Sequence, residues 1–154
     1  MTKSKGYASF AVLCMTILFL AALSDSQAGV EETLAELNAK PIDERQRLLS
    51  ENARKEGTVT LYTATNTRDT QEVLAGFNKN FPFVKVNFLS LGGPGVLNKI
   101  LTEYRAGMHA ADVVILTGNN AVELIDKKIV ARYKSPMVPF LRKGFVDAEG
   151  YWPG

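Results

Sequence analysis

Hydrophobic and polar positions change period several times along the middle of the chain. Three short runs rich in β-branched and aromatic residues predict strands at Thr58 to Tyr62, Lys85 to Ser90 and Asp112 to Leu116. The third run is apolar without alternation, which is expected for a strand that is covered on both faces. The first strand, which follows Gly57, is expected to be central in the sheet.

Helices are expected between and after these strands, where apolar residues recur three and four positions apart. The residues are Val73, Leu74, Phe77 and Phe81 in the first helix, Val96, Leu97, Ile100, Leu101 and Tyr104 in the second, and Val122, Leu124 and Ile125 in the third. Asp69 and Glu72 have capping-box spacing at the start of the first helix. The βαβαβα order predicts an α/β fold, a parallel doubly wound sheet with helices on both faces.

The chain is expected to consist of a helical leader, the α/β lobe and an irregular tail, in addition to its first 28 residues. Residues 29–56 form a charged leader of two helices separated by Pro41, the second capped by Asp43. Residues 57–134 form the α/β lobe, and residues 135–154 are an irregular tail rich in proline and glycine. A further strand would normally complete such a sheet, so the lobe is expected to be incomplete.

Residues 1–28 have the pattern of an export signal. Lys3 and Lys5 precede an apolar run from Ala8 to Leu23, and Ser26-Gln27-Ala28 offers small residues where a signal peptidase cleaves. At about 1.5 Å per residue the run would span ~24 Å, less than a hydrocarbon core of ~30 Å. A cleaved signal is therefore favoured over a retained membrane anchor, and a periplasmic location is expected.

Charge and composition argue against nucleic-acid binding, an intrachain disulfide and a metal cluster. The chain has 154 residues and a net charge of +2, and no dense basic run follows the signal, so we expect no nucleic-acid partner. Cys14 is the only cysteine and His109 the only histidine. An intrachain disulfide and a cluster of several histidines or cysteines around a metal are therefore excluded, and no cofactor is predicted.

The candidate ligand-binding residues lie in the loops that follow the three strands. In a parallel sheet these loops emerge at one edge, and open α/β sheets bind ligands there. Their hydroxyl, amide and backbone N–H groups suit a small polar or anionic solute, although such residues are also good turn and cap formers. The candidates are Thr63, Ala64, Thr65 and Asn66, then Gly92 and Gly93, and finally Thr117 and Gly118.

Other residues give weaker signals of chemistry. Gly92 to Gly95 lacks the spacing of a P-loop or a dinucleotide fold. Glu103 and Asp112 are the nearest approach to paired carboxylates, but surface or capping roles are expected for both. His109 is expected to be an exposed loop residue. Arg68 could clamp an anion at a helix start, but a solvated residue of the first turn is favoured. With no nucleophile elbow in the sequence, we expect no enzymatic activity.

From about Glu56 onwards the chain resembles a known family. The matching stretches include Glu56 to Val59, Leu61 to Ala64, Leu101 to Gly107, Tyr133 to Pro136 and Asp147 to Trp152. Together and in this order they resemble the extracellular solute-binding proteins of bacterial ABC importers, which have a type II periplasmic-binding fold. The iron(III)-type subgroup is the most similar in appearance.

The resemblance implies capture of a solute between two lobes and delivery to an ABC permease in the inner membrane. The family's first-lobe contacts fall on the loop residues named above. Iron-binding members use a histidine or acid after the first strand, where this chain has Thr65 and Asn66, so no metal site is predicted. The chain ends near the end of the family's first lobe, which implies a truncated chain or one half of a split pair whose second lobe is encoded separately.

Two other functions remain open from the sequence. One is a doubly wound α/β enzyme acting on a small phosphorylated or anionic substrate. The other is a remnant that binds nothing. For a truncated or split binding protein, we expect weak or no solute binding by the chain alone.

Overall fold

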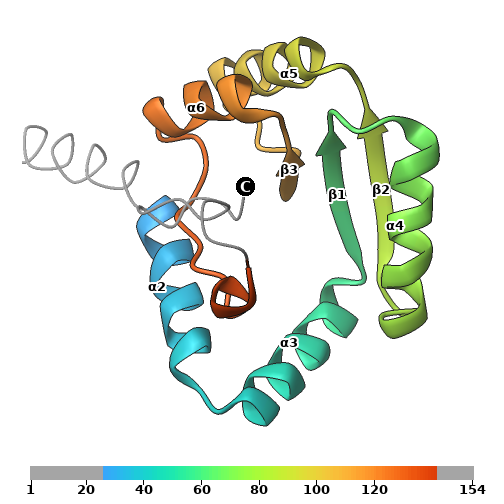
Figure 1. Ribbon diagram of the computed structural model, residues 1–154. Helices are drawn as coiled ribbons and strands as arrows, with labels where there is room; N and C mark the ends of the chain where they lie inside the picture. Colours follow the sequence, from blue (N-terminus) through green and yellow to red (C-terminus); the bar gives the residue numbers. More distant parts are fainter. Residues whose placement is uncertain (1–25, 142–154) are drawn as a thin grey trace, which may run out of the picture.

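The computed structural model describes residues 26–141 (Figure 1). The predicted export signal lies outside the described residues, except for Ser26 to Ala28, and so does the tail after Leu141. The elements in order are α2 (Ser26–Ala39), α3 (Ile42–Glu56), β1 (Thr58–Thr63), α4 (Thr67–Asn80), β2 (Lys85–Ser90), α5 (Gly93–Arg105), β3 (Val113–Ile115), α6 (Gly118–Asp126) and the 3-10 helix η2 (Val138–Phe140). None of the helices in this range is long and apolar enough to cross a membrane.

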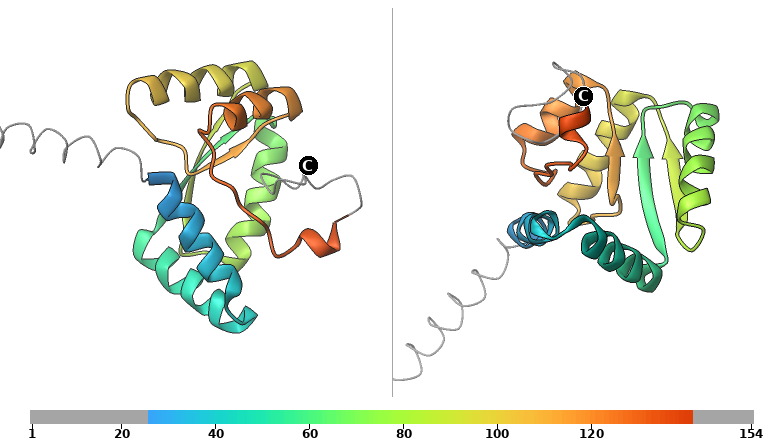
Figure 2. Two further views of the ribbon diagram at one scale, coloured as in Figure 1. Left: turned by 90° about the vertical axis from the view of Figure 1, so that its left-hand side faces the viewer. Right: turned by 60° about the horizontal axis from the view of Figure 1, so that its bottom comes forward.

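The three strands form one parallel sheet in the order β2-β1-β3, so the predicted α/β class and the central place of β1 are confirmed. Tyr62 lies beside Leu89 of β2 on one side and Val114 of β3 on the other. Helix α4 connects β1 to β2, and α5 then crosses β1 to reach β3 at the opposite edge, so the chain has the winding expected of a doubly wound sheet. Figure 2 shows α5 and α6 on one side of the sheet and α4 on the other.

The core lies between the sheet and the helix pair α5 and α6. Tyr62 packs with a stripe on α5 and with Leu124 of α6, which is 1% exposed. The buried residues of the α5 stripe are Val96, Leu97, Ile100 and Leu101, in agreement with the predicted spacing. This packing fixes both helices, and therefore their first turns, against the carboxyl ends of the strands.

The opposite face of β3 is not covered by the described residues. Val113 is 47% exposed and Ile115 is 46% exposed, although Leu61 beside Val113 is buried. The expectation that the third strand is covered on both faces is therefore wrong for this part of the chain. Since α4 contacts β2 at the other edge of the sheet, it leaves the β3 side of this face open.

Two helix starts differ from the sequence-based expectation. The N-cap of α3 is Pro41, and Asp43 lies inside the first turn, where its charge suits the helix dipole. The N-cap of α4 is Asn66, so the helix begins before the predicted Asp69 and Glu72 box. Val73 also lies outside the buried face of α4, with 67% of its surface exposed.

The leader helices lie at the amino ends of the strands. Helix α3 ends at Gly57, whose φ of 70° is a left-handed conformation that glycine adopts without strain, and β1 begins at the next residue. Helix α2 binds the segment after α6, because Asn38 Nδ2 donates to the Lys134 carbonyl at 2.9 Å and Glu31 Oε1 accepts from the Arg132 N–H at 2.8 Å. The leader therefore packs against the lobe from below (Figure 1).

Candidate functional site

The loops after β1, β2 and β3 meet at one edge of the sheet, which we call the rim: residues 63–66, 90–93 and 116–118. Backbone hydrogen bonds hold the loops together. The Ala64 N–H donates to the Ile115 carbonyl at 2.8 Å, and the Leu91 N–H donates to the Thr63 carbonyl at 3.0 Å. The sequence-predicted candidates are thus placed next to one another by the parallel pairing of the strands.

The β1 loop is shaped by its own hydroxyl and amide groups. Thr63 is 0% exposed, and its Oγ1 accepts from the Thr65 N–H at 3.0 Å. The Ser90 hydroxyl of the neighbouring strand donates to the Thr65 carbonyl at 2.7 Å. Thr63 therefore fixes the loop from inside, and Ala64 and Thr65 are only half-buried.

Asn66 is exposed, but its side chain is occupied by the start of α4. Its Oδ1 accepts from the Asp69 N–H at 2.9 Å, and its Nδ2 donates to Asp69 Oδ2 at 2.8 Å. Arg68 is 87% exposed at its side chain and forms a 3.5 Å ion pair with Glu72, as expected for a solvated residue of the first turn. In this arrangement the Asn66 amide is used in capping α4, and the Arg68 charge is paired with Glu72 on the same helix.

The β2 and β3 loops converge at Gly93. A Cβ atom placed on Gly93 would lie 2.5 Å from Asn120 Nδ2 and 3.4 Å from Thr117 Oγ1. The absence of a side chain at Gly93 therefore lets the first turn of α6 lie against the first turn of α5. By contrast, Gly92 and Gly118 have open space at the same position, so they form the accessible part of the rim.

Helices α5 and α6 both begin at the rim without a side-chain cap. Thr117 is the N-cap of α6, yet its hydroxyl caps no backbone N–H. The N–H groups of Gly93, Gly95, Gly118 and Asn119 have no acceptor among the described residues. Two helix N-termini with unsatisfied donors, each with a partial positive charge, therefore lie side by side.

The sequence did not predict a cluster of three ionisable groups formed by Tyr62, which directly precedes the rim residue Thr63, and by Lys99 and Glu103 of α5. Glu103 was expected at the surface, but it is 8% exposed, so that expectation is wrong. Its Oε1 accepts from the Tyr62 hydroxyl at 3.0 Å and from Lys99 Nζ at 2.6 Å. Its Oε2 is buried and has no hydrogen-bond partner in the structure.

The cluster shifts the pKa of all three of its groups. Burial raises the pKa of Tyr62, and the Glu103 carboxylate adds to the effect. The hydrogen bond from Lys99 lowers the pKa of Glu103 against the opposing effect of burial, and that same bond raises the pKa of Lys99. At neutral pH the cluster is therefore a protonated phenol and an ammonium that share one carboxylate oxygen.

The four-residue spacing of Lys99 and Glu103 could have predicted that this pair forms an ion pair. Lys99 and Glu103 are four residues apart on α5, and Ile100 and Leu101 between them are buried, so part of the pair faces the core. The other predicted surface acid, Asp112, does have a local role, since its Oδ2 accepts from the Thr60 N–H at 2.8 Å. His109 is exposed and its ring lies 5.6 Å from that of Tyr104.

Comparison of the chain with protein-family models gives no match, and comparison with curated proteins also gives none. Within the described residues, no group of three or more histidine, cysteine or acidic side chains is arranged to hold a metal ion.

Proposed function

We propose that this chain captures a small polar or anionic solute at the rim, as the first half of an exported, bilobed solute-binding component of an ABC importer. The observation that carries the proposal is the pair of uncapped helix N-termini of α5 and α6, which meet where all three strands end. Backbone N–H groups in this position bind carboxylate, phosphate or hydroxyl oxygens without any charged side chain.

The glycines of the rim support the same function. An added Cβ on Gly92 or Gly118 would meet nothing within 4 Å, so a ligand can approach the backbone there. Thr117 is exposed beside Gly118, and its hydroxyl, which accepts a long 3.5 Å bond from Asn120 Nδ2, still has a proton to donate. The function is binding and release, without catalysis, followed by delivery to a permease in the inner membrane. The resemblance in sequence and the pattern predicted to be an export signal support a periplasmic location.

A single rim covers one side of its ligand. High-affinity pockets enclose about 70–90% of a small ligand, and one lobe supplies roughly half of the contacts. If a complete site binds at about 1 μM, or about −8 kcal/mol, half of that free energy corresponds to a dissociation constant near 1 mM. The rim of the described lobe alone should therefore bind weakly, and a second lobe opposite it would complete the site.

The test is an NMR titration of the isotope-labelled chain with carboxylates, oxyanions, sugars and amines. We expect a solute of the right class to bind near millimolar concentration and to shift the amide signals of Gly93, Gly95, Gly118 and Asn119. Calorimetric binding at micromolar concentration by the chain alone would contradict the half-site argument.

Gly118→Asp gives a sharp control because the new carboxylate meets open space and suits a helix N-terminus, so the fold is retained. For an anionic solute we expect at least ~10-fold weaker binding by this variant, and near-normal binding by the neutral Gly118→Asn. If Gly118→Asp and Gly118→Asn bind an anion equally well, the anion does not bind at the rim. Turnover of a phosphorylated substrate by the purified chain would instead favour the enzyme alternative.

A further inference from the structure

The carboxyl ends of α5 and α6 border an open hollow of about 320 Å³ that is distinct from the rim. It is lined by Leu101, Tyr104 and Arg105 of α5, and by Lys127 and Ile129, which follow α6. Since α5 begins at the rim, Arg105 at its end lies ~18 Å further along the helix axis. We propose that this hollow binds a small monocarboxylate with an aromatic or branched apolar body.

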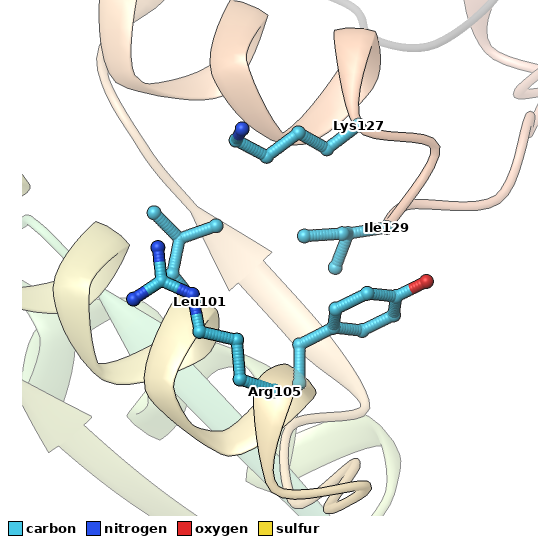
Figure 3. A pocket seen from close by; sticks show the side chains of 5 residues that line it. Leu101, Arg105, Lys127 and Ile129 are labelled. Atoms are coloured by element: carbon cyan, nitrogen blue, oxygen red, sulfur yellow. The ribbon is translucent and has the colours of Figure 1, made fainter.

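The two cations give the hollow its preference for an anion. Figure 3 shows the side chains of Arg105 and Lys127 extending toward the same end of the hollow, beside Leu101. Arg105 forms no ion pair or side-chain hydrogen bond with any residue in the described part of the chain. A guanidinium with free donors binds a carboxylate through two parallel hydrogen bonds.

Lys127 is only loosely paired. Its Nζ lies 3.8 Å from Glu123 Oε1, which is too long for a hydrogen bond, and both side chains are almost half exposed. A ligand carboxylate between Arg105 and Lys127 can replace this contact. Glu123 therefore competes with the ligand for one of the two cations.

The helix ends limit the charge of the ligand. Arg105 is in the last turn of α5 and Lys127 is the C-cap of α6, so each cation also lies at the negative end of a helix dipole. Each helix end contributes about −0.5 of a charge, and Glu123 beside Lys127 adds a full negative charge, so the two cations are almost balanced. That balance suits a monocarboxylate better than a phosphate dianion. A role at the helix ends explains each cation separately, but not why both share one hollow.

Apolar side chains supply the rest of the surface. Leu101 is buried and Ile129 half-buried, and Tyr104 is 43% exposed, so it presents its ring to a ligand. A volume of about 320 Å³ is enough for a small aromatic acid such as an arylacetate. It lies at the lower end of the range for small-molecule sites, so we expect binding near millimolar concentration.

The experiment is an NMR titration of the isotope-labelled full chain with phenylacetate. Its neutral analogue 2-phenylethanol and inorganic phosphate serve as comparison probes. We expect saturable phenylacetate binding with shifts confined to residues near 101–105 and 127–129, and at least ~10-fold weaker binding of the other two. Equal binding of 2-phenylethanol, shifts located at the rim, or no saturation would overturn the proposal.

Variants identify the groups that contact the carboxylate. Arg105→Gln and Lys127→Gln should each weaken phenylacetate binding about 10-fold, and Glu123→Gln should tighten it about twofold, because Lys127 is then released. The matched control is Lys79→Gln on the distant α4, which should change nothing. Circular dichroism checks that each variant is folded. If Arg105→Gln is not folded, Arg105→Lys replaces it, and unchanged binding by both this variant and Lys127→Gln refutes the site.

Discussion

Replacing Tyr62 with phenylalanine isolates one buried hydrogen bond beneath the rim. The tyrosine is 6% exposed, and its hydroxyl donates to Glu103 Oε1 at 3.0 Å. Phenylalanine fills the same space and removes only the oxygen. Glu103 then keeps its bond from Lys99 but loses one of two donors, while its Oε2 has no partner already.

The expected loss of stability depends on the charge of Glu103. A buried hydrogen bond to a charged group contributes about 1.5–3 kcal/mol and a neutral one about 1 kcal/mol. Tyr62→Phe should therefore lower the free energy of unfolding by about 2 kcal/mol at pH 7. The pKa of Glu103 is lowered in the folded chain, so its ionised form adds stability above its usual pKa of 4.5. That contribution is lost as the pH falls through the folded-state pKa.

Urea unfolding followed by circular dichroism measures the difference between wild type and Tyr62→Phe from pH 7 down to pH 3. We expect the deficit to shrink toward about 1 kcal/mol as the pH falls through the folded-state pKa of Glu103, which lies below 4.5. In a Glu103→Gln background the Tyr62→Phe deficit should be about 1 kcal/mol at every pH. A deficit at pH 7 in the wild-type background no larger than that in the Glu103→Gln background would refute the reasoning.

Three further predictions concern the stability and solubility of the lobe. Leu124→Ala, at a side chain that is 1% exposed between α5 and the sheet, should cost about 2–4 kcal/mol in urea unfolding, and a loss below 1 kcal/mol would mean that α6 is not docked. Gly57→Ala should cost about 1–2 kcal/mol, because the φ of 70° strains a residue with a Cβ, whereas Gly76→Ala in the middle of α4 should be neutral or stabilising. Ile115→Thr should change stability by less than about 0.5 kcal/mol and reduce light scattering at high concentration, because this half-exposed side chain lies on the face of β3 that residues 26–141 leave uncovered. Unchanged scattering would show that this face does not drive association.

The sequence predicted the strands and the rim well because both depend on local patterns. β-branched runs placed β1 and β2 within a residue of their observed bounds, and parallel pairing then brought Thr63, Gly92 and Thr117 to one edge. The partly covered face of β3 could not be predicted, since the same apolar run suits a strand covered on one face or on both. Glu103 was missed because burial of a charged side chain depends on Tyr62, which is 41 residues away in sequence.

Helix α2 is attached to the lobe by contacts that can open without unfolding the sheet. Its long-range bonds include one from Asn38 to the Lys134 carbonyl and one from the Arg132 N–H to Glu31, both exposed, and Leu34 and Leu37 are only half-buried. Contacts of this kind contribute a few kcal/mol together, so a detached form should be present at about 1%. Helix α2 therefore restrains residues 132–134, and its detachment would let this segment change direction relative to the sheet. Amide hydrogen exchange in α2 should be far faster than in β1.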